Sequence, residues 1–289
     1  MVYDLLIGPF AEFAFMRRAL VGTIALAVGA GPIGVFLMLR RMSLVGDAMA
    51  HAILPGAALG FLVAGLNLFT MTAGGLLAGM IVAVLTGVVA RVTALKEDAA
   101  LAAFYLVSLA LGVTIVSVKG TNIDLLHVLF GTVLALDDPT LILIGAITSI
   151  TLIVLALIYR PLVLECVDAG FLRSVSRAGA PAHLAFLALV VLNLVAGFHA
   201  LGTLLAVGLM MLPAVAARFW ARDISAMIAV AIGVGIVSGF AGLLISFHAS
   251  VPSGPAIILV AGTASMLSLF LGHVGGVLWQ AFPGRHLEA

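Results

Sequence analysis

Long apolar stretches fill most of the chain, and short polar or Gly/Pro-rich segments separate them. A transmembrane helix needs about 20 mostly apolar residues to cross roughly 30 Å of hydrocarbon. Such segments are predicted at 19–39, 45–64, 69–91, 99–118, 139–159, 182–198, 201–219, 224–247 and 255–278. The pattern therefore predicts an all-α fold, a polytopic transmembrane helical bundle of eight or nine spans.

The region from His183 to Arg218 allows two interpretations. It forms either two short spans broken between Gly197 and Gly202, or one span with a partly inserted piece. Both are open because glycine is tolerated inside a membrane where neighbouring helices cover the backbone.

Composition supports the membrane assignment. Hydrophobic residues make up 64% of the 289 residues and charged residues only 9%, whereas soluble domains carry about 25% charged residues. We therefore expect residues 1–289 to form one transmembrane domain with no room for a soluble catalytic domain. The net charge of +1 argues against nucleic-acid binding.

Basic residues indicate the orientation, because loops on the cytosolic side are enriched in them. If nine segments cross, one face receives ten of the 13 basic residues, and that face is expected to be the cytosol. These ten are Arg40, Arg41, Arg91, Lys96, Arg160, Arg173, Arg177, Arg218, Arg222 and Arg285. Arg17 and Arg18 do not fit, so we expect an N-terminal interfacial segment over 1–18, with a helix from Phe10 to Leu20 from which they reach water.

Glycines at four-residue spacing recur, Gly56 and Gly60 among them. In lipid this spacing allows helix backbones to approach closely. It predicts a tightly packed bundle and carries no functional message of its own.

Asp47 is the one acidic residue inside an apolar run, and such a group needs a cavity, a partner or a substrate. His51 follows four residues later, so a helix places both side chains on one face with Cβ atoms about 6 Å apart. One metal ion can bind both, because zinc accepts carboxylate and imidazole while manganese prefers oxygen and tolerates imidazole. Two copies around a homodimer axis would double the ligand set. The alternatives are an Asp–His hydrogen bond between helices, or an Asp at the cytosolic interface.

The longest expected cytosolic loop, about 160–181, contains a short predicted helix. Asp168 can cap its start, and Gly179 with Pro181 is expected to stop it. Phe171 and Val175 share one face, and Arg173 and Arg177 share another. Such a helix suits docking into a soluble motor subunit, or alternatively lying on anionic lipid.

Several motifs are absent from the sequence. It contains no Gly-x-x-x-x-Gly-Lys-Ser/Thr loop, so ATP-driven work would require a partner subunit. His-Glu-x-x-His and Gly-x-Ser-x-Gly are missing as well, which counts against a membrane enzyme. The other histidines, His183 included, fall at or near span ends, where a polar tip reaches water. A gradient-driven transporter or channel, with Asp47 as a proton relay, remains the alternative class.

Four stretches resemble the bacterial permeases of ATP-driven zinc and manganese importers. They are Gly31-Pro-Ile-Gly-Val-Phe-Leu-Met-Leu-Arg-Arg-Met-Ser-Leu-Val-Gly-Asp-Ala-Met-Ala-His-Ala52, Leu129-Phe-Gly131 with Leu134, Gly202-Thr-Leu-Leu-Ala-Val-Gly-Leu-Met-Met-Leu-Pro-Ala-Val-Ala-Ala-Arg218, and Pro252-Ser-Gly-Pro255. The resemblance implies a multi-pass permease of the bacterial cytoplasmic (inner) membrane that forms a homodimer and works with a cytosolic ATPase subunit and an extracytoplasmic metal-binding protein. No cofactor is expected to be permanently bound, because the metal is cargo and the partner uses the ATP.

The resemblance also implies roles for particular residues. Asp47 and His51 match the family's acidic and histidine pair along the metal pathway, with zinc favoured as the ion and manganese next. The loop matches the ATPase-coupling segment, although Arg173-Ser-Val-Ser-Arg177 departs from the usual Asp-x-x-x-Ala pattern. The coupling residues expected there are Asp168, Phe171, Leu172, Arg173, Val175 and Gly179.

Overall fold

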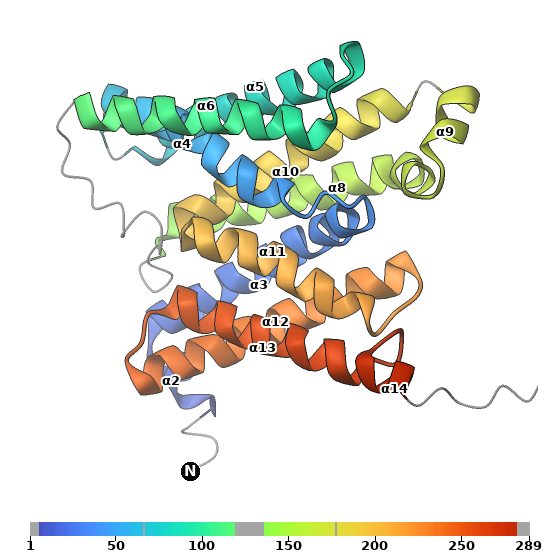
Figure 1. Ribbon diagram of the computed structural model, residues 1–289. Helices are drawn as coiled ribbons and strands as arrows, with labels where there is room; N and C mark the ends of the chain where they lie inside the picture. Colours follow the sequence, from blue (N-terminus) through green and yellow to red (C-terminus); the bar gives the residue numbers. More distant parts are fainter. Residues whose placement is uncertain (1–5, 66, 119–135, 177, 282–289) are drawn as a thin grey trace, which may run out of the picture.

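The computed structural model describes residues 6–65, 67–118, 136–176 and 178–281, and within them the chain forms a bundle of helices (Figure 1). Eight helices are long and apolar enough to cross a membrane, which confirms the expected fold class. They are α3 (Ala14–Leu39), α4 (Val45–Ala64), α5 (Leu68–Val92), α6 (Glu97–Val118), α8 (Asp138–Val167), α10 (Gly179–Leu201), α12 (Ile224–Ala249) and α13 (Ser253–Leu271). Four shorter helices are α2 (Gly8–Glu12), α9 (Ala169–Val175), α11 (Thr203–Arg218) and α14 (Val277–Ala281).

The ambiguous region from His183 to Arg218 contains two helices. α10 ends at Leu201 and is capped by Gly202, whose φ of 81° is one that glycine adopts without strain. The apolar α11, 16 residues long, then runs back across the bundle beside α3 and α13 (Figure 1). The break near Gly202 is therefore present, but only α10 has the length of a span, so both interpretations of this region stay open.

Small residues set the distance between packed helices. A Cβ atom on Gly56 of α4 would lie 2.0 Å from the carbonyl oxygen of Gly74 on α5, and one on Gly34 of α3 would lie 1.9 Å from the carbonyl oxygen of Met210 on α11. Real atoms do not approach so closely, so only glycine allows these backbone contacts. Gly60 shows the same contact with Thr70, in line with the predicted close packing.

The N-terminal region differs from the expected interfacial helix over 10–20. α2 ends at Glu12 and α3 begins at Ala14, so Arg17 and Arg18 belong to a long buried helix. Arg17 Nη1 donates a 2.7 Å hydrogen bond to the carbonyl oxygen of Ala11 at the end of α2. Arg18 Nε lies 3.0 Å from Asp138 Oδ1 at the start of α8. Both arginines are exposed, as expected, but each also contacts a protein group that the sequence pattern does not show.

Helix α8 is longer than the predicted segment 139–159. It continues to Val167 through Pro161, so the first part of the expected cytosolic loop is helical. Its start is capped by Asp137, whose side chain accepts a 3.1 Å hydrogen bond from the main-chain N–H of Thr140. Hydrogen bonding to Thr140 lowers the pKa of the Asp137 carboxyl, because it stabilises the ionised form.

Candidate metal site and its surroundings

Asp47 and His51 lie on one face of α4, as the spacing predicts. Asp47 is in the first turn, and its Oδ1 is 3.9 Å from Nε2 of His51. That distance is too long for a hydrogen bond. Two ligand atoms each about 2.1 Å from one ion lie about 3.4 Å apart in tetrahedral geometry, so a small adjustment of the two side chains would bring both to one ion.

The pair lies at the surface of the single chain. The Asp47 side chain is 68% exposed and that of His51 is 32% exposed. A carboxylate on a helix of membrane-spanning length is costly unless it faces a partner, a cavity or an ion. No cluster of three or more His, Cys, Asp or Glu that could hold a metal occurs among the described residues. Within the described residues, Asp47 and His51 are thus a pair without a third His, Cys, Asp or Glu beside them.

Helix α6 supports α4 behind the candidate ligands. The ring of Tyr105 stacks beside His51, with centroids 6.4 Å apart. The hydroxyl of Ser108 donates a 2.9 Å hydrogen bond to the carbonyl oxygen of Ala52. Gly112 lies against Pro55, where a Cβ would be 3.1 Å from the proline nitrogen. Pro55 has no N–H to offer the carbonyl four residues earlier, so α6 braces α4 at the place where its own hydrogen-bond ladder is interrupted.

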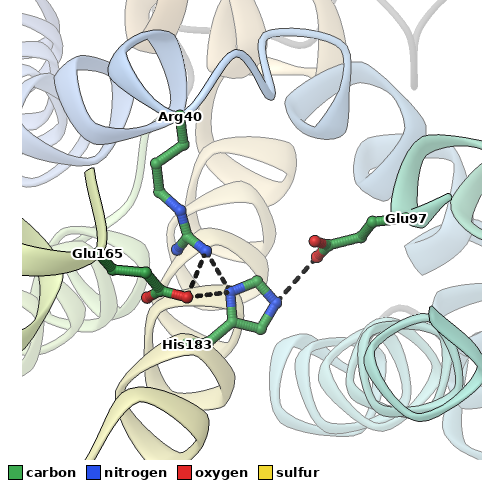
Figure 2. A network of polar contacts seen from close by, with 4 residues as sticks. All are labelled: Arg40, Glu97, Glu165 and His183. Carbon is green, nitrogen blue, oxygen red and sulfur yellow. Dashed lines mark hydrogen bonds and ion pairs between the residues drawn. The ribbon is translucent and has the colours of Figure 1, made fainter. Parts of the chain in front are cut away.

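A buried polar cluster joins four helix ends on the side predicted to be cytosolic. Figure 2 shows Arg40, Glu165, His183 and Glu97 pointing toward one another from α3, α8, α10 and α6. Arg40 Nη2 lies 3.2 Å from Glu165 Oε1 and also contacts Nδ1 of His183. The other ring nitrogen, Nε2, is 2.8 Å from Glu97 Oε1. These contacts connect the four side chains into one polar network.

Burial makes the ion pairs of this cluster costly to break. The side chains of His183 and Arg40 are 6% and 9% exposed, and that of Glu165 is 16% exposed. Removing one partner from a buried ion pair typically costs roughly 3–5 kcal/mol, because it leaves the other charge unpaired. The sequence pattern does not predict this cluster, since each member falls at a span end where water is the expected partner.

Helix α9 lies in the segment that the sequence analysis expects to couple to the ATPase. Asp168 caps it, accepting a 2.9 Å hydrogen bond from the main-chain N–H of Phe171, as predicted. Leu172 is buried, whereas the Phe171 side chain is exposed. The side chains of Arg173 and Val175, together with Arg177, lie outside the described part of the structure.

The expected stop at Gly179 is wrong. α9 ends at Val175, and Gly179 begins α10 instead. A Cβ on Gly179 would lie 3.1 Å from Leu172 Cδ2, so the glycine makes room for the leucine that anchors α9.

These features define a polytopic helical membrane protein with a polar pair on one span. Residues 12–272 match the model of the ABC 3 transport family. The chain therefore belongs to that family, the permeases of metal ABC importers, and it is a multi-pass transport subunit, not an ATPase.

Individual relatives agree along almost the whole chain. The manganese import system permease protein ScaB of Streptococcus parasanguinis is 31% identical over 265 residues, which cover 92% of this chain and 93% of the relative. The chelated iron transport system membrane protein YfeD of Yersinia pestis is 30% identical over 274 residues, covering 95% and 91%. The solved structure of PsaBC from Streptococcus pneumoniae in complex with Fab superposes with a TM-score of 0.84 at 28% identity, covering 97% of this chain and all of that one (100%).

Proposed function

We propose that this permease carries a divalent metal ion past Asp47 and His51, as a homodimer driven by a separate ATPase subunit and supplied by an extracytoplasmic metal-binding protein. The observation that carries the proposal is the exposed Asp47–His51 pair, with its two ligand atoms 3.9 Å apart on one face of α4. A second copy facing the first would bring two carboxylates and two imidazoles together and would remove the exposed carboxylate from lipid. An incomplete set on each chain also suits transport, because the ion must be released.

Manganese is the ion we favour. Relatives named for manganese import include those of Streptococcus parasanguinis and Halalkalibacterium halodurans, and a mixed oxygen and imidazole set is compatible with that ion. The preference for zinc expected from the sequence has no support from these names. The zinc preference stays a prediction, and uptake measured with both ions present tests it.

The ATPase is proposed to dock at α9. The exposed ring of Phe171 and the Asp168 cap support this assignment, since they hold a short helix with an apolar side chain at its surface. Leu172 is buried and Gly179 leaves room for it, which supports a role for both in anchoring α9, while their direct part in coupling stays a prediction.

The test is uptake into liposomes that contain the permease, its ATPase and its binding protein. Wild type is compared with Asp47→Asn and His51→Ala for ATP-dependent import of manganese and zinc. We expect at least a tenfold loss of uptake in both variants. The reason is that each substitution removes one ligand from each copy, and so two ligands from the site in the dimer.

Matched controls separate ligand loss from general damage. Asp98→Asn changes an exposed carboxylate in the first turn of α6, as Asp47 is in the first turn of α4. His273→Ala changes an exposed histidine far from the pair along the chain. Both controls should transport like wild type. Uptake that does not depend on ATP would favour a gradient-driven transporter. Normal uptake by the Asp47 and His51 variants would reject the paired site.

A further inference from the structure

We propose that Arg40, Glu165 and His183 are positioning residues that lock α9 to the turn leading into α4, so that movement of the docking helix reaches Asp47. The inference rests on the proposed ATP-driven import. It assigns to the buried cluster a role in coupling, separate from metal binding and from ATPase docking.

The chain connectivity supports this role. Arg40 caps the end of α3, and the tight turn that follows, with Arg41 at φ 59°, leads directly into α4 and Asp47. Glu165 lies three residues before Asp168, the cap of α9. His183 lies in the first turns of α10, just beyond α9. One guanidinium therefore joins the segment before the candidate ligand to both helices that flank the docking helix (Figure 2).

Hydrogen-bond chemistry makes the contacts specific. A guanidinium only donates, so Nδ1 of His183 accepts from Arg40. In the neutral ring the proton then resides on Nε2, which faces Glu97. The Arg40 guanidinium also lies over the Phe186 ring, 5.3 Å from its centroid, so it is held from a second side.

A second connection runs along α6. Glu97 stands at the start of this helix, bonded to His183, and Tyr105 and Ser108 further along the same helix contact His51 and Ala52. The cluster thus reaches α4 both through the Arg40 turn and through the helix that braces the candidate ligand.

Burial makes these elements move together. If α9 pulled α8 and α10 away from α3, Arg40 would be left without Glu165 and His183 in a place from which water is largely excluded. Such a separation is unfavourable, so a displacement of α9 is passed to the α3–α4 turn as a rigid movement.

The experiment measures two quantities on the reconstituted importer: manganese ions imported and ATP molecules hydrolysed, each per folded permease. Glu165→Gln keeps the shape and removes the charge, and Arg40→Gln removes the cation. We expect ATP hydrolysis within about twofold of wild type and a fall of about tenfold in ions imported per ATP. The double variant should be no worse than either single one, because both act on one contact.

The control is the exposed Arg18–Asp138 pair, which also joins distant helices but does not adjoin α9. Asp138→Asn should leave the ratio of ions to ATP unchanged. If Arg40→Gln does not fold, Glu97→Gln tests the same cluster from α6. A proportional fall of uptake and hydrolysis together, or an unchanged ratio, overturns the inference while wild-type import stands. Loss of ATP dependence in wild type itself overturns the proposed function instead.

Discussion

The hydroxyl of Ser108 on α6 donates a hydrogen bond to the main-chain carbonyl oxygen of Ala52 on α4, at 2.9 Å, and Ala52 directly follows His51. Ser108 is 7% exposed, so water does not replace this bond. The contact ties the helix carrying the candidate ligand to its neighbour at the point where Pro55 weakens α4.

Ser108→Ala should therefore disturb both stability and metal binding. We expect a loss of about 1 kcal/mol in unfolding free energy from the missing hydrogen bond. Looser positioning of His51 should raise the half-saturating manganese concentration for uptake roughly threefold. Thermal unfolding in detergent and uptake kinetics in liposomes measure the two effects. Ser149→Ala is the control, because its hydroxyl bonds only to Gly145 within an exposed part of α8. An unchanged half-saturating concentration in Ser108→Ala would show that the bond does not position the ligand.

Gly56→Ala should strongly destabilise the bundle. The new methyl group would meet the backbone of Gly74, which cannot move aside without separating α4 from α5. Overpacking of this kind costs typically 1–3 kcal/mol. Gly233→Ala on α12 is the matched control, since nothing lies within 4 Å of its Cβ position. There the higher helix propensity of alanine should hold or raise the melting temperature. Equal melting temperatures for the two variants would contradict the close α4–α5 contact.

Asp168→Ala should weaken the docking helix without affecting the spans. The lost cap removes about 1 kcal/mol from a helix of only seven residues. We expect a lower affinity of the reconstituted permease for its ATPase subunit, measured by titrating that subunit. Asp168→Ser keeps an oxygen that can accept from Phe171 and should restore most of the affinity. If the Asp168→Ala and Asp168→Ser variants bind the ATPase with equal affinity, the cap does not contribute to ATPase docking.

The spans were predictable because each is a local feature. Length and apolarity alone determine whether a segment can cross a bilayer, so predicted ends such as 45–64 and 224–247 agree with α4 and α12 within a few residues. The predicted end of α8 at 159 was early, since Arg160 and Pro161 resemble a boundary in sequence while the helix tolerates both.

The candidate ligand pair was predictable for the same reason. Asp47 and His51 are four residues apart on one helix, so helical geometry alone brings them to one face. The buried cluster was not, because Arg40 and His183 are separated by 143 positions and each sits where a span ends. Nothing in the local pattern distinguishes a histidine that reaches water from one enclosed by Glu97 and Arg40.

What the sequence by itself determined is the membrane bundle, its spans, the polar pair on α4 and the capped helix α9, since all of these follow from spacing and hydropathy over short distances. Only the tertiary structure decided that Arg17 and Arg18 contact groups on the protein. It also decided that Arg40, Glu165 and His183 are buried together beside Glu97. The physical reason is that partners and burial for a charged group come from helices far away in the chain, and those contacts exist only once the helices have packed.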